Sequence, residues 1–344
     1  MRMRLLRSFY PVVAILAVII AVARPLAASA GSPGWQQYKM AFISGDGRVV
    51  DTGNNGISHS EGQGFGMLLA VLNDDRPTFI SLWQWTYSHL YRPDKGLFIW
   101  RYVPDQPKGE RDMNTASDGD TLIAWSLLLA GQQWREAAYT EASASIQQAL
   151  AEQTVRQVGA YTVMLPGLEG FAHTDQVVIN PSYFIFPAWQ AFYRFSHDPV
   201  WQLLDKDGRT LLGKMRFGQW QLPTDWVQLD DKGVLAPAAG WPARFGFDAV
   251  RIPLYLRWAG YDGLLQPYRH YWSAIGQGAA PAWIDVSDNQ LADYPVSPGM
   301  EAIKELTLGN GDNKNNAMTL QKSEDYYSAS LHLLAAYAGN HAIR

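Results

Sequence analysis

The sequence predicts an all-α fold, built as a closed ring of helical hairpins with a few short strands in the connecting loops. Apolar residues recur at helical spacing in segment after segment, which indicates about ten to twelve helices. Several segments, such as 121–130, are apolar nearly all round, and a helix of this kind is buried on more than one side. No internal repeat of about 34 or 40 residues is visible, so a closed ring is favoured over an open solenoid.

The expected helices are spread along the chain beyond residue 60. The segments with helical spacing are 64–72, 79–90, 120–130, 142–155, 183–195, 199–215, 247–258, 264–275 and 326–337. Serines stand where N-caps are expected, at Ser60, Ser117, Ser182 and Ser323. The strand-like pieces lie at 48–50, 161–164 and 226–229.

The first thirty residues are expected to be a cleaved secretory signal peptide. Three arginines lie within residues 2–7, residues 11–22 are apolar, and residues 28–30 form a small-residue cleavage site. A membrane anchor is the alternative, but Arg24 and Pro25 interrupt an apolar run that is already short for a membrane span. Signal cleavage is therefore favoured.

Residues 31–344 are expected to form a single domain. No linker rich in Ser, Gly or Pro divides them, and the composition does not shift along the chain. No other long apolar run free of charge appears, so we expect a mature protein that does not span a membrane. Export would place it in the periplasm or outside the cell.

The composition excludes several classes of function. The chain has no cysteine, which excludes a disulfide scaffold, a thiolate metal site and a cysteine nucleophile. The formal net charge of −4 gives no basic footprint for nucleic acid. The 14 Trp and 17 Tyr residues are many for a soluble protein, and flat rings of this kind can stack on the apolar faces of sugars.

Glu61 is the first candidate for chemistry, within the segment Ser58-His59-Ser60-Glu61-Gly62-Gln63-Gly64-Phe65-Gly66-Met67. It falls in the first turn of an expected helix, and the glycines leave the backbone open to the close approach of a ligand. A carboxylate that only complements the helix dipole is an equally good interpretation of this spacing. Dinucleotide binding is discounted, because no strand leads into the motif.

Asp118 and Asp120 open the most apolar of the expected helices. They could be ordinary first-turn residues, but their place on a deeply buried helix puts at least one of them near the core. A buried carboxylate needs a partner or a ligand. Metal binding is conceivable, yet no histidine pair with zinc spacing accompanies them and no calcium loop is complete.

Asp248 and Arg251 form the third candidate pair. They are three residues apart, so we expect them on one face of the helix 247–258, either as a simple ion pair or with Arg251 orienting a functional carboxylate. Tyr183 follows a turn signal and is a candidate hydroxyl donor, although a core tyrosine is the simpler interpretation. Carboxylates in an aromatic-rich chain favour a sugar substrate, since glycosidic hydrolysis requires an acid and a second carboxylate.

Three motifs, taken together and in order, resemble glycoside hydrolase family 8. They are residues 60–67 (SEGQGFGM), 116–120 (ASDGD) and 247–251 (FDAVR). The resemblance is strongest to the bacterial endo-β-1,4-glucanases, periplasmic cellulases that are encoded with cellulose synthase, and it runs from about Trp35 to Leu334. It implies an (α/α)6 barrel with a cleft across one end.

The resemblance also implies roles for three carboxylates in an inverting endo-β-1,4-glucanase. Glu61 matches the general acid, Asp248 the general base, and Asp118 the acid that binds and distorts the sugar at the cleavage point. The two catalytic carboxyls of an inverting enzyme lie about 6.5–9.5 Å apart, with Glu61 protonated and Asp248 ionised.

Further residues match substrate-binding positions of the family. Tyr183 and Arg251 match residues that orient the water and the base, Trp100 matches a stacking platform, and Tyr326 and Tyr327 are weaker matches for sugar contacts. No metal or organic cofactor is needed. The implied partners are a β-1,4-glucan chain as substrate and the cellulose synthase complex.

Two alternatives stay open from the sequence. The enzyme could act on another β-glucan, on xylan or on chitosan, or the chain could be a glucan-binding protein without catalytic activity. The family motif departs at positions 65 and 247, where Phe65 and Phe247 replace the tyrosines of close members.

Overall fold

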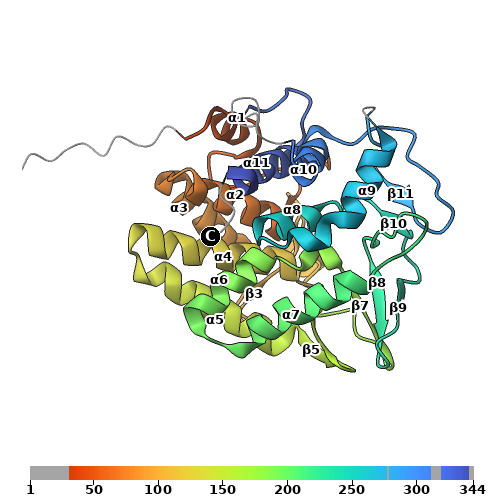
Figure 1. The fold of residues 1–344 in the computed structure, drawn as a ribbon. Coiled ribbons are helices and arrows are strands. Elements are labelled where there is room, and N and C mark those ends of the chain that lie inside the picture. The colour runs from red at the N-terminus through yellow and green to blue at the C-terminus, as the bar shows by residue number, and fades with distance from the viewer. Residues whose placement is uncertain (1–30, 277–278, 311–318, 341–344) are drawn as a thin grey trace, which may run out of the picture.

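The computed structural model describes residues 31–276, 279–310 and 319–340 (Figure 1). The expected signal peptide, residues 1–30, lies outside the described residues. Almost all of the buried apolar side chains belong to one continuous core. Among the described helices, none has both the length and the hydropathy that a membrane span requires.

Helices in contact with one another form a closed inner ring. The ring consists of α2 (Ser60–Leu72), α4 (Ser117–Trp134), α6 (Phe186–Ser196), α8 (Arg251–Trp258) and α11 (Tyr326–Asn340). Each contacts the next, and α11 returns to contact α2. The all-α class predicted from the sequence is therefore confirmed, and this ring together with the helices around it forms the expected (α/α)6 type of barrel (Figure 1).

A second layer of helices packs around this ring. It consists of α1 (Pro33–Phe42), α3 (Arg76–Leu90), α5 (Ala137–Gln153), α7 (Pro199–Lys214), α9 (Gln266–Ile275) and α10 (Pro298–Leu308). Helix α3 packs on α2, α5 on α4 and α7 on α6, while α10 contacts both α8 and α11. The ring helix α4 is buried on nearly every side because it lies between α2, α5 and α6, as its continuous apolar sequence predicts.

Glycines allow α2 and α4 to approach each other closely. A Cβ atom on Gly64 would lie 2.6 Å from Cβ of Leu122, and one on Gly119 would lie 2.2 Å from Oγ of Ser60. The expectation that the glycines of the Glu61 motif admit a ligand is therefore wrong at Gly64, where the space is filled by the neighbouring helix. This close packing fixes the starts of α2 and α4 side by side.

The strands are short antiparallel pairs in the loops. They are β1 (Ser58–His59) with β4 (Arg101–Tyr102), β2 (Tyr91–Arg92) with β3 (Leu97–Phe98), β5 (Val155–Val158) with β6 (Tyr161–Met164), β7 (Gln176–Ile179) with β8 (Val227–Asp230) and β9 (Leu235–Pro237), and β10 (Arg244–Phe245) with β11 (Ile284–Asp285). The expected strands at 161–164 and 226–229 correspond to β6 and β8. The piece at 48–50 forms only an isolated bridge between Val49 and Ile43.

None of the four serines expected as N-caps caps its helix; they are Ser60, Ser117, Ser182 and Ser323. The hydroxyl of Ser117 donates instead to the backbone oxygen of Leu165 at 2.8 Å. The amide oxygen of Asn180 caps the 3₁₀ helix Pro181–Tyr183 by accepting from the Ser182 N–H at 3.0 Å. Ser60, Ser117 and Ser182 are buried, so their hydroxyls lie in the protein interior rather than at exposed helix ends.

Asp120 is expected to make the stability of the protein depend on pH. Its side chain is fully buried, one carboxylate oxygen accepts from the Phe98 N–H at 2.8 Å, and the other has no hydrogen-bond partner. Burial raises the pKa of Asp120 well above its usual range. The folded state thus keeps a proton that the unfolded state releases above about pH 4, and stability falls as the pH rises from there to the folded-state pKa.

Urea denaturation of the wild type and of Asp120→Asn between pH 5 and pH 8 measures this effect. Because asparagine does not titrate, the difference in unfolding free energy should shift in favour of the variant by up to about 1.4 kcal/mol per pH unit within that window. A difference that does not change with pH would show that Asp120 is not protonated by burial.

Candidate active site

The guanidinium of Arg251 joins three carboxylates in the interior of the ring. Its Nη1 donates to Oε2 of Glu61 and, at 3.2 Å, to Oδ2 of Asp118. Its Nη2 donates to Oδ1 of Asp248 and to Oγ of Ser182, both at 2.9 Å. Arg251 is 1% exposed, so its positive charge is available almost entirely to these neighbours. We call Glu61, Asp118, Asp248 and Arg251 the carboxylate cluster.

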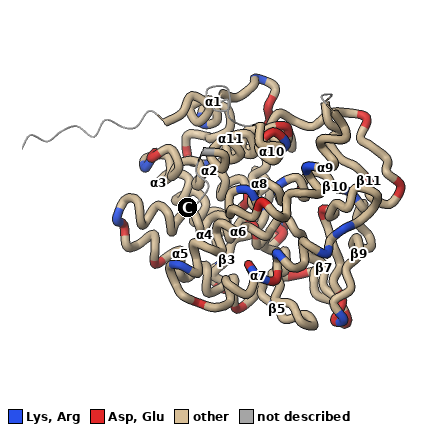
Figure 2. Tube along the Cα trace, viewed as in Figure 1, with Lys and Arg blue, Asp and Glu red and all other residues tan. Residues whose placement is uncertain are grey.

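The helices of the inner ring bring the carboxylate cluster together. Glu61 lies in the first turn of α2 and Asp118 in the first turn of α4, so the positive ends of two helix dipoles face these acids. Arg251 is the first residue of α8. Figure 2 shows positive and negative residues together beside α8, in the middle of the molecule. Side chains that are far apart in sequence thus meet because three ring helices begin at the same place.

Asp248 lies just before α8 rather than inside it. The expected helix 247–258 begins only at Arg251, because residues 247–250 form a turn. The expected ion pair between Asp248 and Arg251 is nevertheless present at 2.9 Å. The side chain of Asp248, in this turn, is 30% exposed. The side chain of Glu61, in α2, is 17% exposed, and that of Asp118, in α4, is only 2% exposed. The carboxylates of Glu61 and Asp248 therefore reach solvent, whereas that of Asp118 is buried beside them.

Burial and mutual repulsion keep protons in the carboxylate cluster. The pKa of Asp118 is raised well above its usual range by burial and by the negative charge of Glu61, and Arg251 only partly offsets this. Burial also raises the pKa of Asp248, against the lowering effect of Arg251, which runs counter to the expectation that Arg251 keeps Asp248 ionised. Since one guanidinium faces three carboxylates, Asp118 and Asp248 keep their protons to a higher pH than isolated aspartates do.

Tyrosine rings line the guanidinium. The ring centroids of Tyr183 and Tyr327 lie 5.6 Å and 5.9 Å from Cζ of Arg251. The hydroxyl of Tyr327 donates to the backbone oxygen of Phe247 at 2.6 Å, which ties α11 to the turn that carries Asp248. Burial, together with the charges of Asp118 and Asp248, raises the pKa of Tyr183 well above its usual range. Tyr183 therefore keeps its hydroxyl proton and can donate a hydrogen bond.

An aromatic row connects Trp100 to the start of α2. The imidazole of His59 stacks on Trp100, with centroids 6.0 Å apart and planes 16° apart, and on Tyr326 at 6.1 Å. Nδ1 of His59 shares a hydrogen bond with the Tyr326 hydroxyl at 3.0 Å. The indole N–H of Trp100 donates to Asp112 at 2.7 Å. Since His59 directly precedes α2, this row lies next to Glu61. The row also places Trp100 and Tyr326 on either side of the His59 ring.

Sequence reasoning missed several side chains around the carboxylate cluster. Ser182 was expected as a helix cap, but its hydroxyl accepts from Arg251. His59 stands in the sequence motif of Glu61 without an expected role, and its ring contacts two predicted sugar-contact residues, Trp100 and Tyr326. Asp225 lies beside Asp248, and its pKa is raised to about 7 by burial and by the charge of Asp248. A lone aspartate before a short strand carries no sequence signal for such a place.

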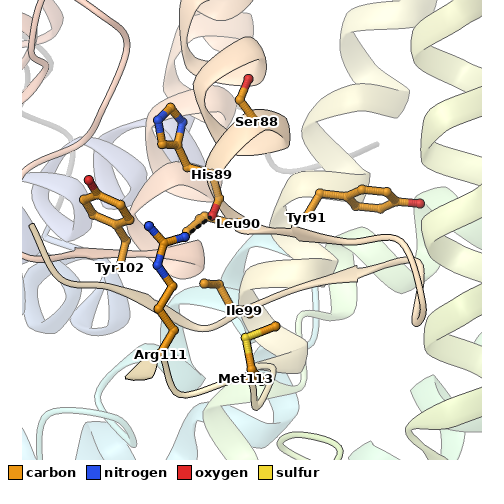
Figure 3. Close-up of a pocket in the computed structure, with 8 residues that line it drawn as sticks. All are labelled: Ser88, His89, Leu90, Tyr91, Ile99, Tyr102, Arg111 and Met113. Atoms are coloured by element: carbon orange, nitrogen blue, oxygen red, sulfur yellow. Dashed lines mark hydrogen bonds between the residues drawn. The ribbon is translucent and has the colours of Figure 1, made fainter. Parts of the chain in front are cut away.

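A separate pocket of about 500 Å³ lies where α3 ends (Figure 3). It is lined by Ser88, His89, Leu90, Tyr91, Ile99, Tyr102, Arg111 and Met113. The guanidinium of Arg111 donates to the backbone oxygen of His89 at 3.5 Å and lies 5.1 Å from the ring of Tyr102. None of the predicted site residues lines this pocket, so it is separate from the carboxylate cluster, which contains the predicted catalytic acids Glu61, Asp118 and Asp248.

The described part of the chain contains no cluster of side chains arranged to bind a metal ion. Within residues 31–276, 279–310 and 319–340, no group of three His, Asp or Glu side chains is arranged to hold a metal ion. The carboxylates of the cluster face a guanidinium instead.

Known proteins resemble this chain over nearly its whole length. The family model of glycosyl hydrolases family 8 matches residues 9–341. An endoglucanase of Cellulomonas uda is 46% identical over 301 residues, which cover 87% of this chain and 84% of the relative.

Solved structures agree with this match. Endoglucanase Cel10 of Klebsiella pneumoniae, a family 8 glycosyl hydrolase, superposes with a TM-score of 0.87 at 47% identity, covering 90% of this chain and 99% of that one. Endo-β-1,4-glucanase CMCax of Acetobacter xylinum gives a TM-score of 0.82 at 34% identity, covering 91% and 98%. The sequence match, the barrel and the three carboxylates around one arginine lead to the same conclusion: the chain belongs to glycosyl hydrolase family 8.

Proposed function

We propose that this glycoside hydrolase is an inverting endo-β-1,4-glucanase that cleaves internal bonds of cellulose-like chains. The observation that carries the proposal is the joint binding of Glu61 and Asp248 by Arg251, with both carboxylates reaching solvent. The relatives reported above, which are 34% to 47% identical to this chain, are named as endoglucanases, and this supports the choice of substrate.

In the proposed reaction, the carboxyl of Glu61 gives its proton to the glycosidic oxygen as the bond from C1 to that oxygen breaks. Asp248 takes a proton from a water molecule, whose oxygen attacks C1 from the opposite face of the sugar. A separation of about 6.5–9.5 Å between the two carboxyls would leave room for that water. The anomeric configuration is inverted by this single displacement.

The neighbouring side chains would prepare the sugar and the proton. Asp118, buried next to Glu61, accepts from Arg251 and is suited to hold the ring at the cleavage point in a distorted form. Trp100, held by Asp112 and stacked on His59, offers a ring on which a neighbouring glucose unit can stack. The Tyr183 hydroxyl, which keeps its proton, is suited to orient the water.

The place of this activity in the cell is a further part of the proposal. The sequence motifs resemble the endoglucanases encoded with cellulose synthase, so we expect the enzyme to trim nascent cellulose next to the synthase complex, in the periplasm or outside the cell. Mass spectrometry of the protein exported by a Gram-negative host tests the first step. A mature chain that begins at Gly31 supports export by signal cleavage, and an uncleaved chain contradicts it.

Release of reducing ends from four polymers tests the activity itself. We expect wild-type protein to cleave carboxymethylcellulose faster than xylan, chitosan or mixed-linkage glucan. Faster cleavage of one of the other polymers would keep the mechanism but change the substrate. Binding of cello-oligosaccharides without any turnover would favour a non-catalytic glucan-binding protein instead.

A further inference from the structure

We propose that Asp225 is a positioning residue, which holds the turn that carries Asp248 in the place where Asp248 can act on water. This inference rests on the proposed function, since it assigns Asp248 the role of general base. Asp225 comes from the segment before β8, whereas Asp248 comes from the segment between β10 and α8. The two segments are tied to each other at this one aspartate.

The carboxylate of Asp225 binds the backbone on both sides of Asp248. Its Oδ1 accepts from the Gly246 N–H at 3.1 Å and from the Ala249 N–H at 2.7 Å. Its own N–H donates to the backbone oxygen of Arg244 at 2.7 Å. Three hydrogen bonds from one residue therefore fix the chain from position 244 to position 249.

The turn needs such a support because no helix provides it. Helix α8 begins only at Arg251, so the N–H groups of residues 246 and 249 have no place in its regular ladder. Gly246 is required for the contact: a Cβ atom at this position would lie 2.9 Å from Oδ2 of Asp225. The side chain of Asp248 leaves the turn between the two supported amides and meets Arg251 at 2.9 Å.

The environment of Asp225 also separates it from an ordinary loop residue. Asp248 and Arg251 are the charged groups that face it, and burial together with the charge of Asp248 raises the pKa of Asp225 to about 7. A protonated Asp225 still accepts hydrogen bonds and adds no negative charge beside Asp248. The contribution of Asp225 is therefore made through the position of the turn, and an amide oxygen could supply it as well.

A carboxylate oxygen that accepts from two backbone N–H groups also occurs away from the cluster, within a single turn, and provides a control. Oδ1 of Asp230 accepts from the N–H groups of Lys232 and Val234 at 3.0 Å and 2.7 Å, in the turn between β8 and β9. Asp230 lies five residues after Asp225 along a largely extended segment, or about 16 Å at about 3.3 Å per residue. An Asp230→Ala variant thus loses two comparable hydrogen bonds without touching the turn of Asp248.

Steady-state kinetics on cellopentaose test the proposal with Asp225→Ala, Asp225→Asn and Asp230→Ala. We expect Asp225→Ala to lower kcat by about 10-fold to 100-fold, because a displacement of about 1 Å can cost this much, while KM stays within about twofold. Asp225→Asn should recover most of the lost kcat, since its amide oxygen accepts from the same two N–H groups. Asp230→Ala should keep the wild-type kcat.

Two results would overturn the proposal: equal kcat values for Asp225→Ala and Asp230→Ala, or an Asp225→Asn variant as slow as Asp225→Ala. If Asp225→Ala does not fold, Asp225→Glu replaces it, because the extra methylene moves the carboxylate. A lower kcat at unchanged KM then supports the proposal, and a wild-type kcat contradicts it. Failure of the proposed function has a different signature, since the wild-type protein itself would then leave cellopentaose intact.

Discussion

Glu61→Gln is expected to lower kcat on cellopentaose by about 10²–10⁴-fold, the usual contribution of a general acid. Glutamine has almost the same shape and can still accept a hydrogen bond from Nη1 of Arg251, but it has no proton to give to the glycosidic oxygen. Binding of the substrate should therefore survive. Isothermal titration calorimetry with cellopentaose measures that binding, and release of reducing ends measures turnover.

The leaving group identifies the role of Glu61. Dinitrophenolate departs without a proton, so Glu61→Gln should cleave dinitrophenyl cellobioside much closer to the wild-type rate than it cleaves cellopentaose. Glu141→Gln, on the exposed side of α5, is the matched control and should behave as wild type on both substrates. If Glu61→Gln loses the same factor on both substrates, Glu61 is not the acid.

Asp248→Asn is expected to lower kcat by a comparable factor of about 10²–10⁴ on both substrates, because a base must activate water whatever group departs. The amide can still accept from Nη2 of Arg251, so the variant should fold and bind substrate. Asp262→Asn is the control, since it removes another Asp–Arg pair of 3.0 Å, between Asp262 and Arg257 near the C-terminal end of α8. Initial rates with the two substrates make the comparison.

Azide provides a second test of Asp248. In Asp248→Gly, azide can attack C1 from the side where water would attack, without giving up a proton. The C1–oxygen bond breaks, Glu61 protonates the departing oxygen, and an α-glycosyl azide forms with inversion. Restored turnover that yields this product supports the role of base. A variant that azide leaves inactive while it binds cellopentaose normally would contradict it.

The apolar periodicity of the sequence was enough to predict the fold class, but it did not predict which residues cap the helices or what packs against their first turns. The apolar spacing of 120–130 identifies α4 correctly because buried ring helices are apolar on all sides. The serines were misassigned because a hydroxyl before an apolar run looks the same whether it caps a helix or lies in the core. Gly64 was misassigned for a similar reason, since a sequence does not show whether a ligand or a helix fills the space above a glycine.

The spacing of residues in the sequence could not predict which side chains meet in the candidate active site. Nothing local in the sequence places Glu61, Asp118 and Asp248 on one guanidinium, because the starts of α2 and α4 and the turn before α8 bring them together. Resemblance to the family predicted these residues by their motifs. The sequence did not predict a role for Asp225 or His59, because their contacts are with backbone groups and rings of other segments.

The central claim is that Glu61 protonates the glycosidic oxygen while Asp248 activates a single water on the opposite face of the sugar. The anomer first released from cellopentaose tests this claim most directly. Proton NMR during the first minutes of hydrolysis distinguishes the α and β signals at C1 before they equilibrate. A displacement by water on a β-linked chain predicts that the α product appears first. A β product at the earliest times would mean that a covalent intermediate forms, and Asp248 could not then be the base that activates the attacking water.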